Sequence, residues 1–390
     1  MRFTTASDDR AGDPGGDRGI AEFRLKRFFN DDLGPAAADN LSPSYCEPLT
    51  VGDLLAMRDH GAEELGRLSL GYPGIHGSQP LRALIARRYD RLSAEHILVL
   101  NGVDDALSLI FLSCVEPGDH VVVHAPGYQP FTALARWRGA GVSLWQARES
   151  AGWALDLDEL PTLIQPTTRL IVVNLPHNPT GYVMPVRERA DLLRLADERG
   201  ITVLCDEIYE GLDLDSIPSG PKAADLSPRA VSLSGLSKNV GLPGLRIGWI
   251  ATANREALDA AKRLRMHLNT FVSAPSEFLA GIALENSAAI LARNRAIARE
   301  NLSLLTAFMD KHRERLTWHA PMAGVSAFPR LLGPRTAEAF CAAVLARTGI
   351  LLAPGPLFDA DNHHFRIGFG VKSVPGMLVA LDAHLSRSAS

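Results

Sequence analysis

Short apolar runs alternate with amphipathic helical patterns between residues 96 and 205, and this alternation restricts the fold more than any other feature of the sequence. Strands that recur between helices typically form a mainly parallel sheet with helices on both faces. We therefore expect an α/β fold. The expected strands are 96–100, 120–124, 142–145, 169–173 and 202–205. The expected helices between them are 103–114, 130–138, 156–163 and 187–198.

The length of 390 residues exceeds that of a usual single domain, so we expect two domains with attached segments. The Gly- and Asp-rich residues 1–18 predict a disordered tail. The N-terminal segment 19–50 would contribute to the smaller domain. The large domain would cover 51–270, and the smaller α+β domain would cover 271–390.

Helix signals also occur outside the alternating region. Residues 20–29 predict a short amphipathic helix, and Thr50, with Asp53 three residues later, predicts an N-cap for a helix that runs to Met57. A long, polar-faced helix is expected over 274–312 and would lead into the smaller domain. Within that domain we expect strands near 325–328, 351–352 and 365–369, and helices over 337–347 and 375–386.

The composition excludes several classes of function. The net charge of −4 comes from evenly mixed signs, which does not favour binding to nucleic acid or to an acidic membrane surface. The four cysteines are far apart and lack metal-binding spacing, and the adjacent His363 and His364 are better explained as a solvated loop pair than as metal ligands. Without a signal peptide or an apolar run of about 18 residues, we expect a soluble, cytoplasmic protein with no metal site.

Three stretches carry chemistry. The first, Ser232 to Trp249, places Lys238 on a Ser- and Gly-rich turn, with Arg246 shortly after it. A lysine that forms a Schiff base needs a partly desolvated site, so that its amine can be neutral. The second stretch is Asn174-Leu-Pro-His-Asn-Pro-Thr-Gly181, and the third is Val203-Leu-Cys-Asp-Glu-Ile-Tyr209.

In this order and at these intervals, the three stretches resemble fold type I pyridoxal-phosphate (PLP) enzymes of the aspartate aminotransferase family (class I/II). The resemblance implies a large domain with a mainly parallel, seven-stranded type of sheet and a smaller α+β domain. It also implies PLP as the cofactor, an α-amino acid as the substrate, and a homodimer. The segment around Leu41 to Pro48 would cross the mouth of the active site.

The resemblance assigns the catalytic residues. Lys238 would form the Schiff base and act as general base, and Asp206 would pair with the protonated pyridine nitrogen. Tyr209 and Asn178 would hydrogen-bond the phenolic oxygen of the cofactor. The residues alone also allow Asp206 to be a helix cap and Asn178 to be a turn residue before a proline. His177 is better explained as a loop residue than as a catalytic acid.

The phosphate group would lie where a helix begins. Gly102, Val103 and Asp104 open the helix 103–114, whose first amides can bind a dianion, and Ser237 and Arg246 would complete this site. Two positions depart from the common family pattern: Asp104 stands where a neutral side chain is usual, and position 235 is Gly where Ser is frequent. Because a carboxylate repels a phosphate, Asp104 should turn away, cap the helix, or bind a substrate group.

Three further residues match family positions. Tyr128 matches the aromatic residue that stacks on the cofactor ring, although an exposed loop tyrosine is also possible from the sequence. Tyr72 matches the tyrosine that reaches the phosphate of the partner subunit's cofactor, with a packed turn tyrosine as the alternative. Arg366, between apolar strand residues, matches the arginine that binds the substrate α-carboxylate.

The stretches Ser234 to Trp249, Val173 to Pro179, Gly324 to Arg330 and Gly349 to Phe358 resemble, more closely, the capreomycidine synthases. These are arginine cyclases of streptothricin- and viomycin-like antibiotic biosynthesis. The resemblance implies a 3-hydroxy- or 3,4-dihydroxyarginine substrate, loss of the 3-hydroxyl group, and closure of a guanidino nitrogen onto Cβ, which gives capreomycidine or a hydroxycapreomycidine for streptolidine-type products. Carboxylates that could bind the guanidinium are Glu47, Asp104, Glu207 and Glu210.

Two other functions remain open at the level of the sequence. An ordinary aminotransferase would use the same residues with 2-oxoglutarate or pyruvate as the amino acceptor, because the shared parts specify a carbanion and not its outcome. A non-catalytic, cofactor-binding regulator is disfavoured, because no basic helix-turn-helix segment is present.

Overall fold

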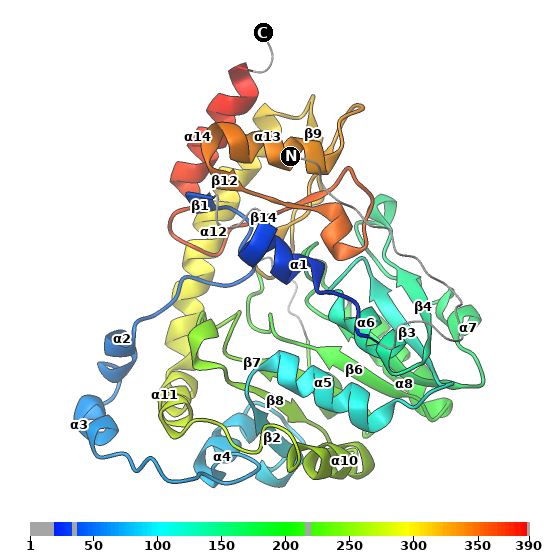
Figure 1. The fold of residues 1–390 in the computed structure, drawn as a ribbon, viewed down its shortest axis with the longest axis vertical. Helices are drawn as coiled ribbons and strands as arrows, with labels where there is room; N and C mark the ends of the chain where they lie inside the picture. Colours follow the sequence, from blue (N-terminus) through cyan, green and yellow to red (C-terminus); the bar gives the residue numbers. More distant parts are fainter. Residues whose placement is uncertain (1–18, 33–36, 215–219, 388–390) are drawn as a thin grey trace.

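The computed structural model describes residues 19–32, 37–214 and 220–387. The expected tail over 1–18 lies outside the described residues. The chain forms a larger part that contains a seven-stranded sheet and a smaller part that lies above it in Figure 1. The long helix α12 (Ser287–Lys311) extends from one part to the other.

The seven-stranded sheet has the spatial order β2-β8-β7-β6-β5-β3-β4. Neighbouring strands pair in parallel, except that β8 is antiparallel to both β7 and β2. This arrangement confirms the expected, mainly parallel sheet. The strands are β2 (Ile97–Leu100), β3 (His120–Ala125), β4 (Gly141–Gln146), β5 (Thr168–Asn174), β6 (Thr202–Asp206), β7 (Val231–Gly235) and β8 (Gly248–Ala251).

Helices cover both faces of this sheet because its strands are apolar on both faces. In β3, Val121 and Val123 pack on the side of helices α5, α6 and α10, whereas Val122 packs on the opposite side with α8. The covering helices are α4 (Gln79–Ala86), α5 (Val103–Cys114), α6 (Pro130–Trp137), α8 (Val186–Glu198), α9 (Ala223–Leu226), α10 (Arg255–Arg265) and α11 (Ala274–Glu285).

The smaller part combines C-terminal elements with the N-terminal segment. Strand β14 (Phe365–Gly368) lies between β10 (Ser326–Ala327) and β13 (Ala353–Pro354) in an antiparallel sheet. Strand β1 (Asp39–Asn40) pairs with β12 (Ile350–Leu351) in parallel. The remaining elements are β9 (Leu316–Thr317), β11 (Arg330–Leu331), α13 (Ala337–Thr348) and α14 (Val374–Arg387).

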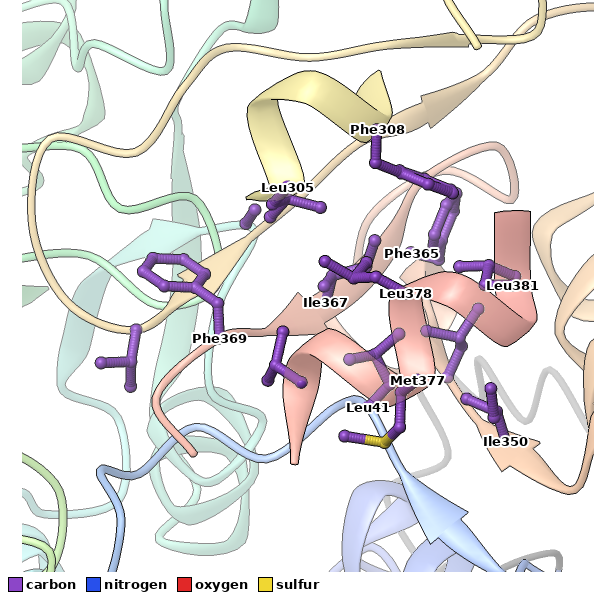
Figure 2. Packing of buried hydrophobic residues seen from close by; sticks show 14 of the residues in the cluster. Leu41, Leu305, Phe308, Ile350, Phe365, Ile367, Phe369, Met377, Leu378 and Leu381 are labelled. Carbon is purple, nitrogen blue, oxygen red and sulfur yellow. The ribbon is translucent and has the colours of Figure 1, made fainter. Parts of the chain in front are cut away.

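An apolar cluster joins several elements of this smaller part. Figure 2 shows Leu41 of the N-terminal segment packed among residues of α12, β14 and α14, such as Leu305, Ile367 and Met377. Burial of Leu41 removes its side chain fully from water, which contributes roughly 2 kcal/mol. Leu41 of the N-terminal segment is therefore part of this core, while the division of the chain into domains stays a prediction.

The N-cap predicted at Thr50 agrees with the structure, because side chains there form hydrogen bonds with backbone amides at the start of the helix. Thr50 Oγ1 accepts a hydrogen bond from the Asp53 amide at 3.0 Å, and Asp53 Oδ2 accepts one from the Thr50 amide at 2.8 Å. This capping box starts α2 (Val51–Leu55), which is followed by α3 (Gly61–Gly66).

Three expected helices differ from the structure. The first is only α1 (Arg24–Arg27), followed by a π-helix over Phe28–Asp32, because the Gln129 side chain binds the carbonyl of Glu22 and the amide of Arg24. The helix expected over 156–163 is only α7 (Leu160–Leu163), because the Asp156 carboxylate accepts a hydrogen bond from the amide two residues later and forms a turn.

The long helix expected over 274–312 is wrong as a single element. It consists of α11 and α12, which are separated at Asn286. The Asn286 side chain donates a hydrogen bond to the Ile282 carbonyl at 2.9 Å and so competes with the backbone for this acceptor. Within the described ranges, we find no helix that could act as a membrane span. All four cysteines are free thiols.

Candidate active site

The candidate site lies where parallel strands of the large sheet end. Asn174 at the end of β5 is in register with Asp206 at the end of β6, and Asp206 is in register with Leu233 of β7. The turn that follows β7 carries Lys238. Ligands of open α/β sheets bind at this carboxyl edge, because the loops there leave a crevice.

Asp206 is a buried carboxylate that needs a cation. Its side chain is almost fully removed from water, and Oδ1 accepts a hydrogen bond from the Ile208 amide at 3.1 Å. Burial raises the pKa of Asp206 to about 7, although the Ile208 amide and the Lys238 ammonium oppose this shift. A desolvated carboxylate of this kind fits a protonated pyridine nitrogen, which would supply the missing positive charge.

Lys238 has the properties of a Schiff-base lysine. Its Nζ donates a hydrogen bond to Ser44 Oγ at 3.0 Å. Burial lowers the pKa of Lys238 to about 8, the Arg366 guanidinium lowers it further, and Asp104 and Asp206 act in the opposite direction. A substantial fraction of the amine is therefore neutral near physiological pH, as imine formation requires.

Arg366 extends from β14 of the smaller part into the same site. Its guanidinium is buried, and it donates hydrogen bonds to Asn178 Oδ1 at 3.2 Å and to the Ser42 carbonyl at 2.8 Å. The Phe358 ring lies under it, with 4.8 Å between the guanidinium carbon and the ring centroid. Burial lowers the pKa of Arg366 to about 10. A buried guanidinium whose hydrogen bonds go to neutral groups of Ser42 and Asn178 fits the anionic end of an amino acid.

Tyr209, like Lys238, forms a hydrogen bond to Ser44 of the N-terminal segment. Its hydroxyl donates a hydrogen bond to the Ser44 carbonyl at 3.1 Å, and burial raises its pKa well above the ordinary value. Ser44 therefore contacts both Lys238 and Tyr209. The structure brings Lys238, Asp206, Tyr209, Asn178 and Arg366 together, and their individual roles stay predictions.

Glycines allow close backbone contacts where the phosphate group is predicted to bind. Gly102 has a φ of 100°, and a Cβ atom there would strike the Arg246 guanidinium. A Cβ atom on Gly248 would lie 2.6 Å from the Gly102 carbonyl carbon, and one on Gly235 would lie 2.7 Å from the Ile247 carbonyl oxygen. The glycine at position 235, which departs from the family pattern, is thus required by close backbone contact.

Arg246 lies beside the first turn of α5. Its Nη2 donates a hydrogen bond to the Asn101 carbonyl at 3.4 Å. The amides of Val103 and Asp104 lie in that first turn, where helix N–H groups lack partners within the helix and bind anions. This geometry fits a phosphate group. Ser237 is buried on the turn before Lys238, and its contact with the phosphate stays a prediction.

The Asp104 side chain turns toward Tyr128 and the N-terminal helix. Oδ1 accepts a hydrogen bond from the Tyr128 hydroxyl at 2.7 Å, and Oδ2 lies 3.2 Å from Lys26 Nζ. Burial alone would raise the pKa of Asp104, but Lys26 and Tyr128 more than offset this and hold it below the ordinary value. The Tyr128 ring packs edge-on against Phe23 and Phe131.

Two predicted residues lie outside this group. Tyr72 is 87% exposed and stacks on Phe271, with ring centroids 4.6 Å apart, so within one subunit it contacts none of the central residues through these interactions. The Glu47 carboxylate accepts a hydrogen bond from the Lys372 amide at 2.8 Å. Both residues keep their assignments as predictions.

The structure contradicts two of the four carboxylates suggested for guanidinium binding. Glu207 is buried in an ion pair with Arg189 and also accepts a hydrogen bond from the Ala223 amide. Glu210 lies 2.9 Å from Lys222 and 3.3 Å from Arg88. Because internal cations already neutralise both groups, neither is available to a substrate.

The histidines have structural partners. His177 bonds to Thr180 Oγ1 at 2.7 Å and to the Pro126 carbonyl at 2.9 Å, and it stacks on His124. Burial lowers the pKa of His177 to about 3, so a loop residue is the better description. His364 is buried between Asp361 and Glu149, so the expectation of a solvated loop pair is wrong for this residue, which packs against Phe328. In the part of the chain that the structure describes, no group of three or more His, Cys, Asp or Glu residues is arranged to hold a metal ion.

Sequence reasoning did not identify Ser42, Ser44 and Lys26. All three lie in the N-terminal segment, and they contact Arg366, Lys238 and Asp104 respectively. The available signal was the Ser-Pro-Ser sequence in the segment expected to cross the mouth of the site. No local pattern marked Lys26.

Comparisons with known proteins agree with this geometry. The sequence model of the family "Aminotransferase class I and II" matches residues 50–375. The chain is 33% identical to capreomycidine synthase from Streptomyces vinaceus over 352 residues, which cover 90% of this chain and 88% of the synthase.

Two solved structures are similar over nearly the whole chain. A PLP-dependent aminotransferase from Streptococcus suis superimposes with a TM-score of 0.89 at 30% identity, covering 94% of this chain and 98% of the other. The PLP-dependent cyclase OrfR superimposes with a TM-score of 0.87 at 28% identity, covering 96% of this chain and all (100%) of the other.

Proposed function

Because this chain belongs to the class I and II aminotransferase family, we propose that it is a PLP-dependent cyclase that acts on a β-hydroxylated arginine. Its fold is that of fold type I PLP enzymes, and its cofactor is pyridoxal phosphate, as the resemblance implied. The observation that carries the proposal is the match to capreomycidine synthase along almost the full length of both chains. The similarity to the cyclase OrfR supports it.

The residues of the site fit the chemistry of such a cyclase. PLP, when bound, withdraws electrons from the α-carbon of an amino acid substrate. Asp206 holds the proton on the ring nitrogen, because its buried carboxylate stabilises the adjacent positive charge. Arg366 and Asn178 bind the substrate α-carboxylate, and Lys238 Nζ removes the proton from Cα.

The proposed reaction balances without an amino acceptor. The substrate loses its Cα proton to Lys238 and its 3-hydroxyl group leaves as water. A guanidino nitrogen then forms a bond to Cβ and gives up a proton, which replaces the proton used to release the hydroxyl group as water, while Lys238 returns a proton to Cα. The net change is the loss of one water with all nitrogen retained, which distinguishes cyclisation from transamination.

We propose a homodimer in which Tyr72 reaches the cofactor phosphate of the partner subunit. Within one subunit, the Tyr72 ring stacks on Phe271 and stays exposed to water. This exposure supports a contact with the partner subunit. Exposed apolar side chains at Leu70, Met266 and Leu268 support an interface in the same region. A cytoplasmic location stays a prediction from the sequence.

The test is the mass of the product formed from 3-hydroxyarginine and from 3,4-dihydroxyarginine. A product that has lost one water and kept all nitrogen supports the cyclase, and the better substrate decides between capreomycidine and a hydroxycapreomycidine for streptolidine-type antibiotics. A keto acid product that depends on added 2-oxoglutarate or pyruvate would establish an aminotransferase instead. Lys238→Ala is the control for uncatalysed loss of water.

A further inference from the structure

An N-terminal arm, defined as residues 19–32, lies against the loop that carries Tyr128. Phe23 packs edge-on against the Tyr128 ring, with 5.3 Å between centroids. Gln129 fixes the arm on both sides of this contact, because its side chain accepts a hydrogen bond from the Arg24 amide at 3.0 Å and donates one to the Glu22 carbonyl at 2.9 Å. Arg24 also pairs with Asp359 near Phe358. The arm therefore holds Lys26 in a defined position.

Lys26 places an ammonium group on Asp104. The Nζ–Oδ2 distance is 3.2 Å, and the two side chains are 57% and 44% exposed. An ion pair with this exposure is weak, typically less than about 1 kcal/mol, so another cation can replace the ammonium. The other carboxylate oxygen is fixed by the buried Tyr128 hydroxyl at 2.7 Å. Asp104 thus keeps its hydrogen bond from Tyr128, while the cation at its other oxygen, Lys26, can be exchanged for another.

Asp104 lies in the first turn of α5, just after Gly102, which is in close contact with the Arg246 guanidinium. Its charge acts on the pKa of both Lys238 and Asp206. A cavity lies beside the Lys26–Asp104 pair, and its walls include the side chains of Phe23, Leu107 and Leu134. Apolar walls that end at a carboxylate suit a methylene chain that ends in a cation.

We propose that Asp104 binds the cationic side chain of the substrate, and that Lys26 holds the same carboxylate when substrate is absent. This inference rests on the proposed function for the identity of the cation, a guanidinium. A guanidinium can take the place of the ammonium at Oδ2, where its several N–H donors point in fixed directions, while Oδ1 keeps the Tyr128 hydroxyl. Binding of a cation also explains why residue 104 is an aspartate, although the common family pattern has a neutral side chain at this position.

The experiment compares L-arginine with L-citrulline, which has nearly the same shape but no charge. Dissociation constants come from the visible absorbance change of the holoenzyme, without a keto acid and before any slower spectral change. The wild-type protein should prefer L-arginine, and Asp104→Asn should reduce this preference by about ten-fold or more, because a hydrogen-bonded charge is lost. Asp105→Asn is the matched control, since it removes the same charge from the same helix turn and should keep the preference.

Lys26→Met gives a second, independent readout. Removal of the internal ammonium should tighten L-arginine binding by a few-fold and leave L-citrulline binding unchanged. The inference is overturned if the wild-type protein has no preference for L-arginine, if Asp104→Asn keeps the preference, or if Lys26→Met leaves L-arginine binding unchanged.

These results are separable from the proposed function. Cyclisation of hydroxyarginine by a wild-type protein whose preference does not depend on Asp104 would sustain the cyclase and reject the role of Asp104. An Asp104-dependent preference for L-arginine in a protein that forms only keto acid would support the role of Asp104 and reject the cyclase.

Discussion

Replacing Asp206 by Asn should stabilise the cofactor-free protein at alkaline pH while weakening its binding of PLP. The carboxylate is buried, and its pKa rises from 3.8 to about 7. A shift of about three units corresponds to roughly 4 kcal/mol, an upper limit because nearby charges respond to the change. Asn keeps an oxygen that can accept the hydrogen bond from the Ile208 amide, so the substitution removes mainly the charge.

The sign of the pH dependence follows from linkage. A raised pKa in the folded state means that the folded protein binds this proton more tightly than the unfolded chain does. The cost of the carboxylate is therefore absent below about pH 4, grows as the pH rises toward 7, and is constant above that. Between pH 5 and pH 8 the cost should increase by about 3 kcal/mol.

Urea unfolding of the cofactor-free proteins measures this difference. The free energy of unfolding of Asp206→Asn, relative to the wild-type protein, should be higher at pH 8 than at pH 5 by about 3 kcal/mol. Equilibrium dialysis at pH 8 should show weaker binding of PLP to the variant. If the variant were less stable by the same amount at both pH values, Asp206 would be a structural helix cap. The claim that its buried carboxylate destabilises the protein until a cation pairs with it would then be refuted.

Three further substitutions test other parts of the site and fold. Lys238→Ala should lack the visible absorbance of bound cofactor, and an unchanged spectrum would assign the Schiff base to another lysine. Arg366→Lys should raise KM for the amino acid by about 10- to 100-fold in steady-state kinetics, because a single ammonium cannot make the paired hydrogen bonds of a guanidinium; an unchanged KM would remove Arg366 from the carboxylate site. Thr50→Ala should lower the free energy of unfolding by about 1 kcal/mol through loss of the capping box, and a change near zero in urea unfolding would show that the cap is dispensable.

Five of the seven sheet strands, and three of the four helices expected between them, were predictable because their signals are local, whereas β7 and β8 were not among the expected strands. Helix α5 has the bounds that its amphipathic pattern predicted, Val103–Cys114, and β6 ends one residue beyond its predicted end, at Asp206. The break at Asn286 was not predictable from periodicity, since the apolar pattern continues across it. It depends on a side chain that binds the backbone within its own helix, which a hydrophobic pattern does not register.

The site was predictable to the extent that its residues follow strand ends. Asp206 and Asn178 follow parallel strands, so topology brings them together. The partners of Glu207 could not be foreseen in this way, because Arg189 comes from helix α8 and its burial depends on packing. Likewise, the contact between Ser42 and Arg366 joins residues that are 324 positions apart, and no local signal relates them.

The contacts of the N-terminal segment have a consequence for protein synthesis. Ser42 is translated well before Arg366, its hydrogen-bond partner, which follows it by 324 positions. Ribosomes add roughly 5–20 residues per second, so the segment waits tens of seconds without its native neighbours. A nascent chain that already carries Lys238 consequently lacks the Ser42–Arg366 contact, and the complete site can assemble only near the end of translation.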